Sequence, residues 1–103
     1  MIYVVATIEL VAGKREEFLA LQRSLLPLVR AEAGCIEYVP TVDVALSDPP
    51  KTPLRGDAII MQEKWETLAH LKAHDVAPHM NDFRVKSKAL VIHTKVEVFE
   101  PIK

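Results

Sequence analysis

Residues 57–83, DAIIMQEKWETLAHLKAHDVAPHMNDF, decide the fold of this chain, because the spacing of their apolar side chains changes partway along. Residues 57–65 have the composition of a β-strand, with side chains that alternate between two faces. Thr67 is placed to cap the helix that follows the strand. Pro78 suits the first position of a further helical turn running through Phe83. The stretch therefore predicts a strand that feeds directly into helical structure.

The same change of spacing occurs near the start of the chain. Residues 2–11 alternate cleanly and predict a strand. From Lys14 the apolar residues recur at helical spacing, and this stripe comprises Phe18, Leu21, Leu25, Leu28 and Val29. Gln22 is expected mainly outside the stripe. Pro27 is expected to kink the helix because it removes one backbone donor, and Gly34 to cap its C-terminal end in the left-handed conformation.

Residues 35–43 and 90–99 predict two further strands, with Pro40 marking the first as an edge or bulged strand. Residues 44–57 are the one long irregular segment, which predicts a lid, a binding loop or a dimer arm. The order β-α-β-β-α-β is the ferredoxin-like split unit, an α+β fold with helices on one face of an antiparallel sheet. Because the strands carry apolar residues on both faces, we predict that two sheets pack into a homodimeric α+β barrel.

Composition limits the classes of protein that remain. With 103 residues, half of them apolar, the chain can build one core, and we expect residues 1–103 to form a single domain. The 13 basic and 14 acidic residues are spread along the chain without a basic stripe, which argues against nucleic acid as a partner. No apolar run is long enough to predict a membrane span, and the N-terminus has the pattern of a strand instead of a signal peptide. A single cysteine, Cys35, fits a reducing cytoplasm.

Polar and aromatic side chains are densest in the stretch that decides the fold. On the predicted strand, Met61, Glu63 and Trp65 point to the same side. On the helix that follows, His70 and His74 are four residues apart and share a face. If this helix packs back on the sheet, an imidazole approaches the strand face and a pocket forms.

Three interpretations of the histidines remain open. His70 and His74 have a spacing that could bind a metal with His79 or Glu63, although the H-E-x-x-H motif and a cysteine cluster are absent. Alternatively, His70 lies on the solvated face and His74 is an ordinary half-buried residue with a hydrogen-bond partner. In the third interpretation, His74 or His79 accepts a proton beside a pocket, since imidazole titrates near neutral pH and can deprotonate a phenol.

Three other residues also have a structural and a functional interpretation. Trp65 is either a core anchor or a cavity wall whose indole N–H reaches the substrate. Glu63 is either a desolvated carboxylate with a raised pKa or one partner of an ion pair across the dimer. Tyr38 either offers its phenol to the cavity or simply packs.

Residues 63–80, EKWETLAHLKAHDVAPHM, resemble the signature of the antibiotic biosynthesis monooxygenase domain family. In that family a strand ends in E-x-W-E, a Ser or Thr caps the next helix, and A-H and P-H follow at this spacing. Residues 13–14, 32–35 and 96–101 also match, so the resemblance spans the chain. Within the family, residues 34–43, GCIEYVPTVD, are most similar to the quinol monooxygenase branch.

The resemblance implies a homodimer in which each ferredoxin-like unit holds a cavity between its sheet and helices. It also implies oxygenation of quinols, hydroquinones or polycyclic phenols by O2, without flavin, haem or metal. In this chemistry a base removes a phenolic proton, and the anion then passes an electron to O2. The radical pair recombines to a peroxide that collapses to the quinone. The protein has only to bind, deprotonate and exclude water.

The resemblance also assigns residues. His74 and His79 fall on recurring histidines of the family, so one of them is the expected base, and Trp65 matches the tryptophan that lines the cavity. Substrate contacts are expected at four residues: Tyr38, Met61, Glu63 and Phe83. Met61 stands where the antibiotic-pathway enzymes have an asparagine that bonds to substrate or peroxide. Haem degradation fits poorly, because Thr7 stands where that branch has an asparagine and residues 82–84 stand where it has a haem-ligating histidine.

The main alternative is a protein of the same fold that binds aromatic small molecules without redox turnover, in detoxification or signal degradation.

Overall fold

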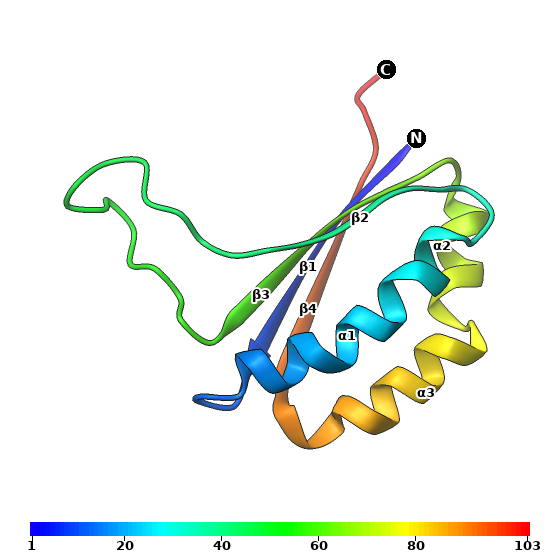
Figure 1. Cartoon of the computed structure of the whole chain (residues 1–103). Coiled ribbons are helices and arrows are strands. Elements are labelled where there is room, and N and C mark those ends of the chain that lie inside the picture. Colours follow the sequence, from blue (N-terminus) through cyan, green and yellow to red (C-terminus); the bar gives the residue numbers. More distant parts are fainter.

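The structure, a computed structural model, describes residues 1–103 as one antiparallel sheet with helices on one of its faces (Figure 1). The elements in chain order are β1 (Ile2–Leu10), α1 (Arg15–Arg30), β2 (Cys35–Thr41), β3 (Ala58–Trp65), α2 (Leu68–Asp75), α3 (Pro78–Ser87), the 3-10 turn η1 (Lys88–Leu90) and β4 (Val91–Phe99). The strands lie side by side in the order β2-β3-β1-β4. The predicted ferredoxin-like α+β fold is confirmed. None of the helices has the length and apolar character needed to cross a membrane.

The central strand β1 determines which side chains face the helices. Its even-numbered residues are all buried under the helices: Ile2, Val4, Ala6, Ile8 and Leu10. Antiparallel pairing sets Val4 opposite Glu63 and Ala6 opposite Met61. Residues that face each other on neighbouring strands point to the same side of the sheet. This register therefore places Glu63 and Met61 on the side that faces the helices.

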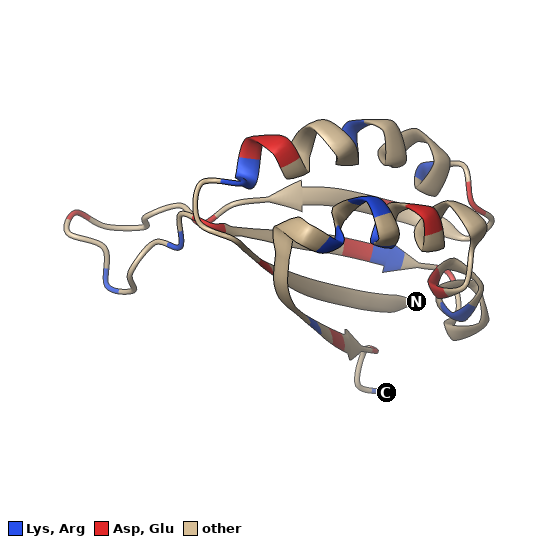
Figure 2. Cartoon of the chain, turned by 90° about the horizontal axis from the view of Figure 1, so that it is seen from below, with Lys and Arg blue, Asp and Glu red and all other residues tan.

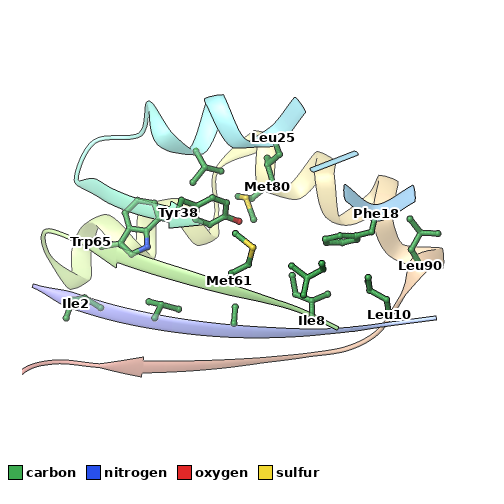
Figure 3. Close-up of a cluster of buried hydrophobic side chains, with 14 residues drawn as sticks. Ile2, Ile8, Leu10, Phe18, Leu25, Tyr38, Met61, Trp65, Met80 and Leu90 are labelled. Atoms are coloured by element: carbon green, nitrogen blue, oxygen red, sulfur yellow. The ribbon is translucent and has the colours of Figure 1, made fainter. Parts of the chain in front are cut away.

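The core between sheet and helices takes most of its buried side chains from β1, α1 and β3 (Figure 3). The buried residues of α1 are Phe18, Gln22, Leu25 and Val29. The predicted stripe was therefore partly wrong, because Leu28 is 53% exposed whereas Gln22 is 1% exposed. The buried residues are spaced four, three and four apart along the helix. They form a narrower face than the predicted apolar stripe.

The helix ends also differ in part from the sequence predictions. α1 continues through Pro27 to Arg30 and is capped by Ala31 at φ −86°, so the prediction that Gly34 caps it was wrong. Gly34 lies instead in the turn before β2, at φ +80°, where its carbonyl accepts a 2.8 Å hydrogen bond from the Glu66 N–H. The Thr67 cap is confirmed, since its hydroxyl oxygen accepts the N–H of the third helical residue at 3.2 Å.

Residues 44–57 project from the end of the sheet, away from the helices (Figure 1). Arg55 closes the base of this loop with two 2.8 Å side-chain hydrogen bonds to the Asp43 carboxylate. These bonds lower the pKa of Asp43 to about 2. Val44 and Leu46, at 87% and 98% exposed, are among the most exposed apolar residues of the chain. No residue of the loop lines the main cavity, so the loop does not cover it within the chain, and the dimer arm stays a prediction.

The second face of the sheet has no covering layer. Tyr3, Val39 and Phe99 are 40–49% exposed, and Gln62 lies among them on β3. Charged residues of both signs are interspersed along the chain, without a continuous basic stripe (Figure 2). The homodimer that would bury this face stays a prediction.

Replacing Gly34 by alanine is expected to destabilise the fold more than the same change at Gly13. Both glycines have a positive φ, +80° and +77°, so both variants should lose about 1 kcal/mol from backbone strain alone. Only at Gly34 would the new Cβ collide, lying 2.2 Å from the Cγ of His70, whereas nothing lies within 4 Å at Gly13. Thermal unfolding should show a further loss of roughly 1–3 kcal/mol for Gly34→Ala.

The double variant Gly34→Ala, His70→Ala provides the control. It removes the contacts with the imidazole atoms and leaves only the one with the His70 Cβ, at 2.7 Å, so it should recover part of the further loss. Equal losses at the two glycines would contradict the crowding at Gly34.

Candidate functional site

A cavity of about 450 Å³ lies between the helix-facing side of the sheet and the three helices. This volume is in the range of small-molecule sites in proteins. Most of its wall is apolar, and the lining residues are Val4, Ala6, Ile8, Phe18, Gln22, Tyr38, Met61, Glu63, Leu71, His74, Asp75, Met80, Phe83, Arg84, Ser87, Lys88, Val91, Thr94 and Val96. The predicted pocket between strand and returning helix is therefore present.

All four residues expected to contact substrate line this cavity: Tyr38, Met61, Glu63 and Phe83. The register of β2 sets Tyr38 opposite Glu63, so both point from the sheet toward the helices. Phe83 enters from α3 and packs edge-on against Phe18 of α1, with ring centroids 5.4 Å apart. Strand register and helix packing bring these four side chains together at the cavity. Their role in substrate binding stays a prediction.

The Tyr38 phenol is held in its neutral form. Burial raises the pKa of Tyr38 above its usual value, and the nearby carboxylates of Glu63 and Glu32 raise it further. The hydroxyl makes no side-chain hydrogen bond within the chain, while the Tyr38 carbonyl accepts two from the Arg30 guanidinium at 3.2 and 3.0 Å. The phenol is thus a positioned donor at the cavity wall.

Trp65 lies behind the cavity wall and is not among its lining residues. The side chain is fully buried, and its indole N–H donates to Glu63 Oε1 at 3.1 Å. The ring packs against the His74 imidazole, with centroids 4.6 Å apart. Because its one donor is already engaged, the indole supports Glu63 and His74 in this structure. The sequence expectation that it lines the cavity does not match this placement, and its catalytic role stays a prediction.

Glu63 is a buried carboxylate with no Lys or Arg partner within the chain. Burial raises the pKa of Glu63, and the charge of Glu32 adds to this, whereas the hydrogen bond from Trp65 and the nearby His74 act in the opposite direction. The interpretation of a desolvated carboxylate with a raised pKa is confirmed. The ion pair across a dimer stays a prediction.

Glu32, which sequence reasoning missed, connects the two histidines that were expected to supply a base. Its Oε2 lies 2.9 Å from His74 Nδ1 and 2.7 Å from His79 Nε2. Since an ionised carboxylate only accepts hydrogen bonds, both facing nitrogens carry their protons. Glu32 is 42 residues from His74 in sequence, so no local pattern pairs them. The only sequence feature that could have indicated Glu32 is its position in residues 32–35, which match the family pattern.

The two histidines occupy different positions. His74 is buried and lines the cavity, and its Nε2 has no hydrogen-bond partner in the chain. In a neutral ring that donates from Nδ1 to Glu32, Nε2 is the nitrogen that can accept a proton. His79 does not line this cavity; it lies on the other side of Glu32, at a separate pocket of about 180 Å³ between α1 and α3. Of the two, only His74 can meet a ligand in the main cavity.

His70 and His74 do not form a joint ligand set. His70 Nδ1 lies 2.8 Å from the Thr67 hydroxyl, and its ring packs against Gly34, whereas His74 bonds to Glu32. No three His, Cys, Asp or Glu side chains are arranged to hold a metal ion. His70 is therefore a structural residue, but it is half-buried against Gly34 and not on the solvated face as expected.

Charged side chains flank one part of the cavity wall. Arg84 Nη2 bonds to Asp75 Oδ1 at 2.8 Å, and Arg84 Nη1 bonds to the Asp75 carbonyl at the same distance. Both side chains are largely exposed, as is Lys88 nearby. The site thus combines an apolar interior, an imidazole supported by a carboxylate, and an exposed ion pair that links α2 to α3.

Glu63→Gln is expected to stabilise the protein more at pH 8 than at pH 5. A carboxyl whose pKa is raised by folding contributes its stability below the unfolded pKa and loses it as pH rises through the folded pKa. The amide carries no charge to desolvate and can still accept the Trp65 N–H. Thermal unfolding of both proteins across this pH range measures the difference.

Glu100→Gln, a change at an exposed carboxylate, controls for the altered net charge and should show no such trend. A gain from Glu63→Gln that is equal at both pH values, or larger at pH 5, would contradict the desolvation of Glu63.

Comparison with known proteins extends these findings. The family model described as "Antibiotic biosynthesis monooxygenase" matches residues 1–86. The Escherichia coli K12 protein "Probable quinol monooxygenase YgiN" is 32% identical over 103 residues, covering 98% of each chain. Among crystal structures, PA3566 from Pseudomonas aeruginosa aligns with a TM-score of 0.80 at 25% identity, over 99% of this chain and 94% of that one. SO0527 from Shewanella oneidensis aligns with a TM-score of 0.75 at 29% identity, over 95% and 87%.

Proposed function

Because the chain belongs to the antibiotic biosynthesis monooxygenase family, we propose that it oxidises quinols or polycyclic phenols with O2 in the cavity between sheet and helices. The substrate class is supported by the name of the Escherichia coli relative. The observation that carries the proposal is the position of His74. Its imidazole lines an apolar cavity, and its Nδ1 is hydrogen-bonded to Glu32. The proposed reaction uses no flavin, haem or metal.

In the proposed first step, His74 Nε2 takes the proton of a substrate hydroxyl. The Glu32 carboxylate, 2.9 Å from Nδ1, stabilises the imidazolium that forms and holds the ring in the required tautomer. The electron-rich anion then passes one electron to O2, and the two radicals combine at a ring carbon to give a peroxide. For a phenol with a C–H para to its hydroxyl, loss of water leaves one oxygen atom as the new carbonyl. In that case the substrate supplies all four electrons that reduce O2 to one water and one carbonyl oxygen. A quinol that is converted to its corresponding quinone supplies two electrons, and O2 leaves as H2O2.

The remaining residues have binding and positioning roles in this proposal. Tyr38, kept neutral by burial, donates to the oxygen that becomes negative. Met61 and Phe83 provide apolar walls, and Glu63 contributes a polar group at the sheet. Trp65 is a positioning residue, because it contacts both Glu63 and His74 but not the cavity.

We also propose that residues 1–103 form one domain of this family and that two chains associate through the uncovered sheet face. The exposed side chains of Tyr3, Val39 and Phe99 support this proposal. Size-exclusion chromatography with light scattering should give twice the chain mass of 11.6 kDa, and a monomer at micromolar concentration would contradict it.

His74→Ala is expected to lower kcat by a factor of about 10² to 10⁴, because it removes the proposed base. His79→Ala should have a smaller effect, about tenfold or less, since it removes only one of the two hydrogen bonds to Glu32. The measurement is O2 consumption by the EDTA-treated protein with a panel of reduced naphthoquinols, after subtraction of autoxidation. His93→Ala, a change at the exposed histidine of β4, is the matched control.

Unchanged turnover in His74→Ala would remove the base assignment, and loss of activity on chelation would contradict metal-free chemistry. No uptake above background with any quinol would favour the second candidate, a protein that binds aromatic molecules without redox turnover. The apolar cavity alone would support that function.

A further inference from the structure

One polar side chain in the cavity wall has a hydrogen bond at only one of its two polar atoms. Gln22 projects from α1, is 1% exposed and lines the cavity. Its Nε2 donates to Met61 Sδ at 3.1 Å, but its Oε1 receives no hydrogen bond. Among the side-chain nitrogen and oxygen atoms that are themselves shielded from solvent, Oε1 is the only one without a partner. A buried acceptor without a donor is unfavourable, so its position at a ligand cavity calls for an explanation.

The contact with Met61 determines which amide atom is left free. A thioether sulfur has no proton to donate and can only accept, so the amide NH2 must face it. Exchanging the two amide atoms would place an oxygen against the sulfur, with no proton between them. The free atom of Gln22 is therefore the carbonyl oxygen, and it requires a donor.

We propose that Gln22 Oε1 accepts a hydrogen bond from a hydroxyl of the bound quinol, and that this bond makes the cavity selective for the reduced ligand. A quinol carries O–H donors, whereas the corresponding quinone carries carbonyl oxygens, which only accept. Oxidation therefore removes the donor and leaves Oε1 unpaired again, which favours release of the product. The inference rests on the proposed function for the identity of the ligand.

The neighbouring side chain permits this contact. Met61 is unbranched and adaptable, so its thioether can shift together with the Gln22 amide and keep its contact with Nε2 when a hydroxyl approaches Oε1. Met61 also occupies the cavity wall, and it therefore meets the same ligand. The apolar surroundings strengthen the selectivity, because water has little access to replace the missing donor.

The test compares the binding of 1,4-naphthohydroquinone and 1,4-naphthoquinone by anaerobic titration calorimetry. The wild-type protein should bind the hydroquinone about tenfold more tightly than the quinone. Gln22→Met, similar in length and without an acceptor oxygen, should lose about tenfold in hydroquinone affinity and change its quinone affinity by less than about twofold. Gln22→Leu is the second variant, should Gln22→Met fail to fold.

Ser87→Ala is the matched control. Ser87 also lines the cavity, but its hydroxyl already donates to the Phe83 carbonyl at 2.8 Å, so its loss should leave the preference intact.

Three results would overturn the inference: equal affinities for the two ligands in the wild-type protein, a preference that survives in Gln22→Met, or no binding of either ligand. Selective hydroquinone binding without O2 consumption would instead remove the proposed monooxygenase function and leave the role of Gln22 standing. The two proposals therefore fail by different measurements.

Discussion

The site depends on one carboxylate oxygen that holds two helices against the end of a third. Glu32 follows α1, and its Oε2 accepts N–H groups from His74 of α2 and His79 of α3. The carboxylate is mostly buried, so these hydrogen bonds meet little competition from water. They fix the position of the helices over the sheet, and the cavity is the space that this arrangement leaves. The same contact fixes the tautomer of His74.

Burial in the cavity wall disfavours negatively charged groups, and this makes the imidazole of His74 important for the proposed reaction. Burial raises the pKa of both Tyr38 and Glu63, because it disfavours the charged form of each group. An anionic ligand would be disfavoured there for the same reason unless a cation formed beside it. Proton transfer to His74 creates anion and cation together as a pair. Deprotonation and binding of the anion are thus a single event in the proposed mechanism.

Much of the fold could be predicted from local patterns. The alternation along β1, the Thr67 cap and the start of α3 at Pro78 each depend on a few neighbouring residues, and each was found as predicted. The predicted apolar stripe of α1 was partly wrong, because tertiary contacts determine which face of the helix meets the sheet. The sheet contacts a narrower face of the helix than expected, which buries Gln22 and exposes Leu28.

The site could be predicted only as a set of cavity residues. Strand alternation correctly indicated the side of Met61 and Glu63, but not the distances between groups from different elements. The link from Glu32 to His74 spans 42 residues, and no spacing rule covers it. Trp65 likewise packs against His74, a residue of the next element, and strand alternation alone does not show this contact. Side chains whose partners are distant in sequence are therefore the ones that local patterns miss.

The 44–57 loop is closed at its base, so the fold should tolerate insertions and substitutions in this segment. Asp43 and Arg55 clamp the two ends of the loop outside the core, and nothing between them contacts the cavity. The rest of the molecule therefore places few demands on the length or composition of residues 47–52, which are exposed or nearly so. Evolution can vary this segment without altering the cavity, and a peptide tag or a fluorophore can be grafted there for the same reason.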